Sequence, residues 1–161
     1  MADCLPIFLW DLRKRESLSP NHRLSRWPFA LVHSGWQGTG IALEALDLMA
    51  KLWDTRPEDV AAVFGPCIQP CCYRVDEARA LAFEKEFGGS GGFYPLGPVT
   101  QKRDDAYYLD LPAANARLLA NQGLQSLSVC KNCTVMDERL GSFRREGPLY
   151  TRMAAVLGYF S

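Results

Sequence analysis

Residues 29–53 read FALVHSGWQGTGIALEALDLMAKLW, and this stretch decides the class of fold. The short apolar run Phe29–His33 predicts a buried strand, and the small residues of Gly35–Gly40 predict a tight turn after it. The apolar residues that follow recur at helical spacing and predict the buried face of a helix: Ile41, Ala45, Leu48, Met49 and Leu52. A strand, a turn and a helix in direct succession indicate a protein that mixes both kinds of element.

The same criteria place further elements on both sides of this stretch. Apolar runs predict strands at Leu5–Asp11, Val60–Phe64, Tyr107–Leu111, Leu124–Val129 and Met153–Tyr159, the last of which is expected to close the sheet. One helix is predicted from the N-cap Asp76 through Glu86, and another has Pro112 in its first turn and Gly123 just past its end. Residues 12–27 and 88–98 are predicted to be surface loops. Periodicity alone does not separate an α/β from an α+β arrangement.

Bulk composition narrows the class of protein. The chain has 161 residues, enough for one domain with a real core, and its 18 basic and 18 acidic side chains cancel. Because nucleic-acid binders normally carry a basic surplus, we expect no nucleic-acid partner. No apolar run approaches the roughly 20 residues that a membrane span needs, and no basic segment precedes the first apolar run as in a signal peptide. We therefore expect six free cysteines in a reducing cytoplasm.

Cys4 and His33 are the first candidates for chemistry. Cys4 opens one predicted strand, and His33 ends the next and is followed by a tight turn. Each alone is compatible with a purely structural role. If the two strands are neighbours, the thiol and the imidazole face each other across them at the rim of a cleft. The pair is then either an activated nucleophile or two ligands of a zinc site, and the spacing does not choose between these.

Other cysteines and arginines carry weaker signals. Cys130 and Cys133 form a CxxC, but a zinc ribbon needs a second pair at matching spacing, and a redox motif needs a following helix. The sequence therefore predicts that this CxxC is neither a zinc ribbon nor a redox catalyst. The vicinal pair Cys71-Cys72 is interpreted as buried packing at a turn. The planar donor forks of Arg144 and Arg145 suit a phosphate or a carboxylate, although a solvated surface is an equal alternative.

Read in order, several motifs resemble those of one family, the laccase-domain family. Ala2–Ile7 resembles its T-A-D-C-x-P segment, Val32–Thr39 its V-H-A-G-W-R-G-T, and Gly65–Val75 its G-P-S-I-G-P-C-C-Y-E-V. The remaining matches follow in register: Pro57–Val60 before the third motif, then Leu109–Leu111 with Asn115, Cys133-Thr134, Ser142–Arg145 and Thr151–Ala154. The resemblance covers nearly the whole chain.

The resemblance implies a fold, an activity and a site. The fold is α+β, a layered sandwich of mixed β-sheets flanked by helices. The activity is zinc-dependent phosphorolysis of purine nucleosides, with adenosine deamination as a companion. Carried over, Cys4 and His33 are metal ligands and catalytic residues, and Arg144, Arg145 and Arg152 are candidates for binding substrate. Three alternatives stay open: a Cys-His hydrolase or editing factor for peptidoglycan precursors, an inactive remnant, and a copper polyphenol oxidase. So few histidines and cysteines disfavour the last.

The sequence departs from the family pattern in three places. The family's first metal histidine lies in a Q-V-H-G motif upstream of the metal cysteine, whereas this chain starts beside that cysteine. We therefore expect a single laccase-type domain that is truncated at its N-terminus relative to the family. Gln37 replaces the arginine of G-W-R-G, which removes a positive charge, and the long segment before His33 carries the only other histidine, His22. With two ligands placed, we expect weak zinc binding and low activity unless His22 completes the site.

Overall fold

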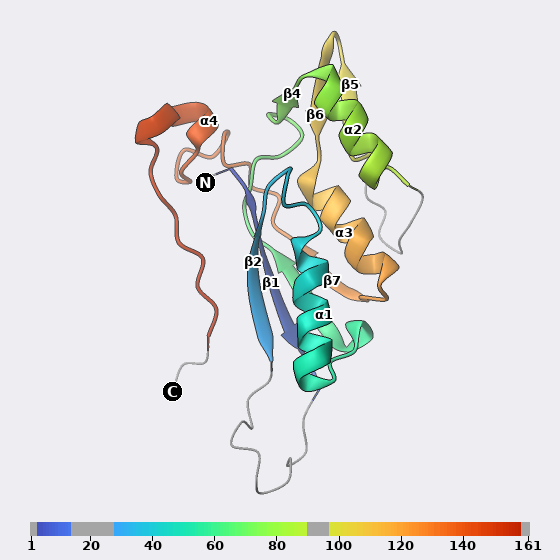
Figure 1. Ribbon diagram of the computed structural model, residues 1–161. Helices are drawn as coiled ribbons and strands as arrows, with labels where there is room; N and C mark the ends of the chain where they lie inside the picture. The colour runs from blue at the N-terminus through green and yellow to red at the C-terminus, as the bar shows by residue number, and fades with distance from the viewer. Residues whose placement is uncertain (1–2, 14–27, 90–96, 159–161) are drawn as a thin grey trace, which may run out of the picture.

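The computed structural model describes residues 3–13, 28–89 and 97–158. Its larger sheet has the order β2-β1-β3-β7 (Figure 1). The strands are β1 (Leu5–Asp11), β2 (Phe29–Ser34), β3 (Val60–Phe64) and β7 (Ser126–Val129). β1 runs antiparallel to both β2 and β3, while β3 and β7 are parallel. This sheet is therefore mixed.

A smaller sheet and the helices complete the fold. The smaller sheet is antiparallel in the order β4-β6-β5, with β4 at Arg74–Val75, β5 at Thr100–Arg103 and β6 at Ala106–Leu109. The helices are α1 (Ile41–Trp53), α2 (Glu77–Phe87), α3 (Leu111–Asn121) and α4 (Phe143–Glu146), with short 3-10 turns at Pro57–Asp59 and Gly147–Leu149. The predicted α+β class, with mixed sheets flanked by helices, is confirmed.

Helix α3 joins two hydrophobic cores. Its residues Ala116 and Leu119 pack with α1 against the larger sheet, where Leu5, Ile7 and Leu9 of β1 are fully buried. The earlier residues of α3, from Leu111 to Ala114, pack with α2 and the smaller sheet. Figure 1 shows α3 between the two sheets, with α1 beside the larger one and α2 beside the smaller. One helix thus contributes side chains to both cores.

The predicted helix caps are confirmed. The Asp76 carboxylate accepts a hydrogen bond of 2.8 Å from the Arg79 amide at the start of α2. Asp110 caps α3 in the same way through Ala113, and Pro112 lies in the first turn of that helix. Gly123 follows the helix with a positive φ of 96°, a conformation that glycine adopts without steric cost. Because α3 begins at Leu111, the strand predicted at Tyr107–Leu111 ends two residues early, at Leu109.

The predicted buried face of α1 is wrong in part, since Met49 is buried and Ala45 partly buried as expected, but the buried side is rotated away from the other three residues. Ala42, Leu46 and Met49 are the buried residues, whereas Leu48 and Leu52 are more than half exposed. Apolar residues cover more than half of the surface of this helix, so the spacing of hydrophobic residues alone did not fix which part of that surface faces the core.

The strand predicted at Met153–Tyr159 is also wrong. Residues 151–158 are coil in the structure, and most of them are exposed, Val156 by 73%. No strand of the described chain pairs with them, so the apolar run lies on the surface of the molecule rather than closing the sheet. The predicted loops fall largely outside the described residues, as does His22. Within the described ranges, no helix is long and apolar enough to cross a membrane.

Candidate functional site

The pairing of β1 with β2 brings Cys4 and His33 to the same face of the larger sheet. His33 lies opposite Pro6, and Leu5 lies opposite Ser34. Because side chains alternate along a strand, Cys4 projects to the same side as Pro6 and hence to the side of His33. The two are diagonal neighbours in the ladder, a relation in which backbone positions lie about 7–8 Å apart and side chains can meet.

The turn after β2 is shaped to leave room for Cys4. A Cβ placed on Gly35 would lie 3.2 Å from the Cys4 Sγ, tighter than nearly all real contacts, so glycine suits this position. The turn is held from below by the buried Asn115 of α3. The Asn115 Oδ1 accepts hydrogen bonds from the Ser34 hydroxyl at 3.2 Å and from the Gly40 amide at 3.4 Å. In the sequence Asn115 stands out only as part of a motif, because its anchoring role depends on contacts between residues about 80 positions apart.

Cys4 and His33 both line a cavity of about 570 Å³. Its walls come from the start of β1, the turn after β2, the loop before β4, and α4. The lining residues are Asp3, Cys4, His33, Gly35, Trp36, Gln37, Gly38, Ile68, Tyr73, Phe143 and Arg144. The lining includes three aromatic side chains, those of Trp36, Tyr73 and Phe143. It also includes one cation, the guanidinium of Arg144. The volume lies in the range of pockets that hold small molecules, and the lining carries both the Arg144 cation and the Asp3 carboxylate.

A second hollow of about 490 Å³ shares Cys4 and His33 with the first. It is lined by Pro6 and Phe8 of β1 and by Met153 to Ala155 of the C-terminal segment, with Arg139 and Leu140 at its edge. The cysteine and histidine thus lie between two spaces, one aromatic and cationic, the other mainly aliphatic.

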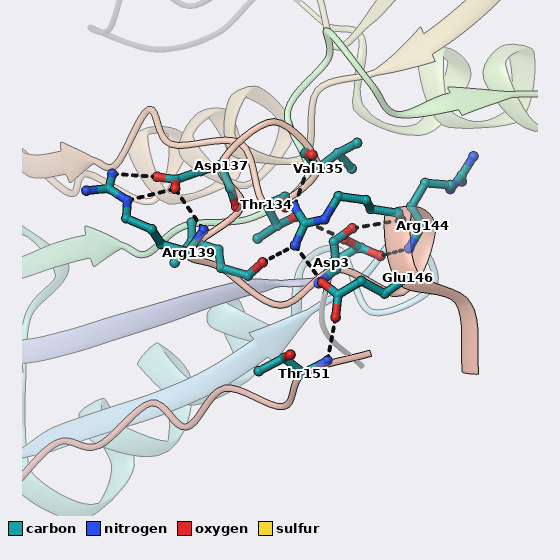
Figure 2. Close-up of polar contacts among 11 residues, drawn as sticks. Asp3, Thr134, Val135, Asp137, Arg139, Arg144, Glu146 and Thr151 are labelled. Carbon is teal, nitrogen blue, oxygen red and sulfur yellow. Dashed lines mark hydrogen bonds and ion pairs between the residues drawn. The ribbon is translucent and has the colours of Figure 1, made fainter. Parts of the chain in front are cut away.

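Asp3 holds the walls of the first cavity together (Figure 2). One of its carboxylate oxygens accepts hydrogen bonds from the hydroxyls of Thr134 at 2.9 Å and Ser142 at 2.7 Å, and the other accepts one from the Arg144 amide at 2.8 Å. Its backbone carbonyl accepts from the amide of Ile68 at 3.2 Å. Asp3 therefore fixes Cys4 relative to α4. In the sequence it stands out only by its place beside Cys4 in the motif at Ala2–Ile7.

The three arginines named from the sequence lie in different surroundings. Arg144 lines the cavity, donates to the Arg74 carbonyl at 3.0 Å and has its guanidinium 5.5 Å from the centre of the Tyr73 ring. Arg145 instead donates to the carbonyls of Thr134, Val135, Asp137 and Leu140 and pairs with Glu146 at 2.5 Å. Arg152 is exposed on the C-terminal segment and lines neither space.

Glu146 ties this arginine network to the C-terminal segment, as Figure 2 shows. Its carboxylate accepts hydrogen bonds from the amides of Thr151 at 2.7 Å and Ser142 at 3.0 Å. These amides, that of Thr151 first, and the Arg145 guanidinium lower the pKa of Glu146 to about 2. The carboxylate is therefore ionised at neutral pH, and it holds α4 in place beside the cavity.

Burial shifts the acid–base behaviour of two cavity residues. It raises the pKa of the Cys4 thiol, and the neighbouring Asp3 carboxylate adds to the increase. Burial also raises the pKa of Tyr73, so its hydroxyl keeps its proton at neutral pH. At the rim, the Arg79 guanidinium lies 4.6 Å from the centre of the Trp36 ring. A positive charge therefore remains near this turn, although Gln37 carries none.

The described residues contain two groups that could hold a metal. Cys4 and His33 offer a sulfur and a nitrogen donor, and no third histidine, cysteine or carboxylate of the described chain forms a close group with both. The second group is Cys71, Cys72 and Cys133. The interpretation of Cys71-Cys72 as buried packing is wrong, because Cys71 is exposed and Cys72 is only partly buried.

The thiols of this cysteine group differ in acidity. Burial and the hydrogen bond with Cys72 raise the pKa of Cys71 to about 12. Burial also acts to raise the pKa of Cys133, but hydrogen bonds from backbone amides, that of Gln69 first, outweigh it and lower the pKa. The sequence did not predict the group, since Cys133 is separated from the other two by about 60 residues.

Comparisons with known proteins find similarity along nearly the whole chain. A family model described as multi-copper polyphenol oxidoreductase laccase matches residues 1–159. A protein of Geobacillus stearothermophilus named purine nucleoside phosphorylase YlmD is 33% identical over 98% of this chain and 53% of its own length. A Bacillus subtilis protein of the same name is 30% identical over 98% of this chain and 52% of its own.

A solved structure shares the fold. The crystal structure of YlmD from Geobacillus stearothermophilus superposes with a TM-score of 0.68 and 30% identity, covering 90% of this chain and 50% of that one. The chain spans about half the length of the curated relatives it matches.

Proposed function

Because the chain belongs to the multi-copper polyphenol oxidoreductase laccase family, and its curated relatives are named purine nucleoside phosphorylases, we propose that it forms part of a zinc-dependent purine nucleoside phosphorylase site. The observation that carries the proposal is the shared cavity. Cys4 and His33 lie on one wall, three aromatic side chains form others, and Arg144 supplies a cation. A purine nucleoside and phosphate need all three kinds of group.

The donor atoms of Cys4 and His33 fit zinc. A thiolate sulfur and an imidazole nitrogen are preferred zinc ligands, and catalytic sites combine three protein ligands with one open position. The described residues supply two of the three. When bound, the ion would polarise the leaving group or lower the pKa of a bound water, which is also what adenosine deamination requires. Cys4 would have to lose its proton to bind, and the positive charge of the ion would offset the burial that raises the pKa of this thiol.

The aromatic walls suit the purine. Stacking of a base on an aromatic side chain contributes about 1–3 kcal/mol and does not depend on which purine is bound. Tyr73 and Phe143 line the cavity from different segments, and Trp36 lies in the turn after His33. The protonated Tyr73 hydroxyl can donate a hydrogen bond to a ring nitrogen, which favours departure of the base as C1′–N9 breaks.

Arg144 is the residue proposed to bind phosphate. One of its nitrogens donates to the Arg74 carbonyl, which fixes the side chain, while other N–H groups remain for an anion. A guanidinium binds phosphate through paired hydrogen bonds, which would hold an oxygen of phosphate against C1′. Arg145 has its donors committed to four carbonyls and Glu146, so we assign it a positioning role, and Arg152 is left without a role in binding.

The proposal is tested by measuring both binding and turnover. Purified chain is incubated with inosine or adenosine, with and without phosphate, and free base and ribose 1-phosphate are separated by chromatography. Arg144→Ala should weaken phosphate affinity at least about tenfold, a loss near 1.4 kcal/mol, whereas exposed Arg56→Ala should change nothing. Phosphate binding followed by calorimetry gives this readout even where turnover is low. If Arg144→Ala leaves phosphate affinity unchanged, Arg144 is not the residue that binds phosphate.

The same pair of residues also permits a Cys-His hydrolase, and phosphate distinguishes the two. A hydrolase releases product equally well without phosphate, and it fails when the sulfur nucleophile is replaced in Cys4→Ser. A phosphorolytic site depends on phosphate for any release of base. Dependence of base release on phosphate would therefore favour the phosphorolytic function over the hydrolase.

A further inference from the structure

Three cysteines meet outside the cavity, where two loops lie side by side. Cys71 and Cys72 belong to the turn before β4, and Cys133 lies after β7. The loops are joined by a parallel bridge between Cys67 and Cys133, and the Thr134 amide donates to the Cys67 carbonyl at 3.0 Å. Backbone pairing therefore fixes Cys133 against the turn that carries the other two.

The sulfur atoms are spaced as metal ligands are. All three Sγ atoms lie within 4.8 Å of one another, and those of Cys71 and Cys72 are 3.5 Å apart. Three sulfurs bound at about 2.3 Å around one tetrahedral ion would be separated by roughly 3.8 Å. Shifts of about an ångström at most, within the reach of a side-chain rotation, would bring this group to that geometry.

The surrounding backbone is already arranged around the sulfurs. The Gln69 amide donates to the Cys133 Sγ at 3.5 Å, and the Gln69 carbonyl accepts from the amides of Cys72 at 2.9 Å and Tyr73 at 3.0 Å. Hydrogen bonds from amides to ligand sulfurs orient the ligands and stabilise their negative charge in thiolate metal sites. The turn is thus ordered by contacts that suit a bound cation.

Access and charge also favour a metal. Cys133 is buried and Cys71 is exposed, so an ion can enter from solvent while one side of the site is covered by protein. Three thiolates around a divalent cation leave a net negative charge. The Arg103 side chain lies nearby, donating to the Pro70 carbonyl, and its positive charge acts on Cys72.

We propose that Cys71, Cys72 and Cys133 bind one thiophilic d10 cation, Zn²⁺ or Cu⁺. Soft thiolate ligands select these ions. Binding displaces the thiol protons and forms three metal–sulfur bonds, with no oxidation or reduction. The site shares no ligand with Cys4 and His33 and lines neither of their spaces, so it is independent of the proposed phosphorolysis. Among the described residues, Cys130 is not part of the close group of sulfur atoms, and its Sγ instead donates to the Asn132 Oδ1 at 3.4 Å.

The test uses Cd²⁺ as a spectroscopic probe of thiolate ligation. The full chain carrying Cys4→Ser is reduced, freed of metal, and titrated without oxygen while sulfur-to-cadmium charge transfer is recorded. The expected result is saturation at one equivalent, with an amplitude for three thiolates. Cys71→Ser, which changes an exposed residue, should lower the amplitude and weaken the affinity more than roughly tenfold. Cys130→Ser is the matched control and should change neither.

Two further titrations identify which ion is bound, and several results would contradict the proposal. Zn²⁺ is titrated against a chromophoric chelator and Cu⁺ against bicinchoninate, and one-to-one binding that Cys71→Ser or Cys133→Ser abolishes supports the site for that ion. Three results would overturn the proposal: no charge-transfer band, a band unaffected by Cys71→Ser, or a band lost with Cys130→Ser. Mass spectrometry that finds a Cys71–Cys72 or Cys71–Cys133 disulfide resistant to the reductant would overturn it as well.

Discussion

Asp3 is the residue whose replacement should damage the cavity most without removing a reacting group. Its carboxylate accepts hydrogen bonds from Thr134, Ser142 and the Arg144 amide, all in the 2.7–2.9 Å range. Hydrogen bonds to a charged group contribute about 1.5–3 kcal/mol each, less where water replaces the lost partner. We expect Asp3→Ala to lower the free energy of unfolding by about 2–3 kcal/mol, measured by urea denaturation.

The matched control for this variant is Asp105→Ala. Asp105 is an exposed carboxylate in the turn between β5 and β6, and its removal should change stability by less than about 0.5 kcal/mol. Equal effects of the two substitutions would mean that the Asp3 network contributes nothing specific. A second readout, phosphate binding, should weaken in Asp3→Ala because Arg144 loses the contact that fixes its backbone.

Asp11 should make the stability of the protein depend on acid pH. The carboxylate is 1% exposed, and burial acts to raise its pKa. Hydrogen bonds from Arg13 and from the Thr55 hydroxyl at 2.9 Å outweigh burial and leave the pKa below its ordinary value. In the unfolded chain the pKa of an aspartate is about 3.9. As the pH falls below about 5, Asp11 is protonated in the unfolded chain before it is protonated in the folded protein. The stabilisation by the Asp11 carboxylate therefore decreases with falling pH, until the pH lies below the pKa of Asp11 in the folded state.

Asp11→Asn tests this directly. The variant should be less stable than the unmodified protein at pH 7, and the difference should shrink steadily as the pH is lowered through the carboxylate range. Free energies of unfolding from urea curves at several pH values give the comparison. A difference that stays constant with pH would mean that the ionisation of Asp11 is not linked to folding.

At the scale of elements, the corrected register of α1 gives a paired test. Leu46 is 5% exposed and Leu48 is 54% exposed, two residues apart on one helix. We expect Leu46→Ala to cost about 2–4 kcal/mol through lost burial and the cavity left behind, and Leu48→Ala to cost less than about 0.5 kcal/mol. The measurement is the midpoint of the urea denaturation curve of each variant, compared where the slopes of the curves are unchanged. The reverse ranking would restore the buried face that the sequence predicted.

The elements differ in how far the sequence could predict them. The central strands, including Leu5–Asp11 and Val60–Phe64, are short apolar runs bounded by turn or charged residues, and their length favours a strand over a helix. In α1 the apolar residues cover more than half of the helix surface, so tertiary packing selects which of them are buried. The run after Met153 has strand composition, but strand formation needs a partner edge, which no local pattern can supply.

At the scale of the whole molecule, the candidate site was only partly predictable. Cys4 and His33 lie at the ends of neighbouring strands, so the antiparallel pairing expected of consecutive strands places them together. Asp3 and the three-cysteine group depend instead on contacts between segments more than 60 residues apart. These arise from the parallel pairing of β3 with β7 and the bridge that extends it from Cys67 to Cys133. Sequence spacing carries no information about such pairings.

The chain should therefore bind zinc with two separate affinities. In the Cys133→Ser background, which disables the three-cysteine group, Cys4 and His33 remain as the two proposed zinc ligands. Loss of one ligand from a three-ligand site costs several kcal/mol, and each 1.4 kcal/mol is about tenfold, so a nanomolar site becomes micromolar or weaker. Chelator competition should give a micromolar dissociation constant that His33→Ala raises further. Tight binding that His22→Ala abolishes would identify His22 as the third ligand. Tight binding that survives both His22→Ala and His33→Ala would show that zinc binds elsewhere and that this pair is not the metal site.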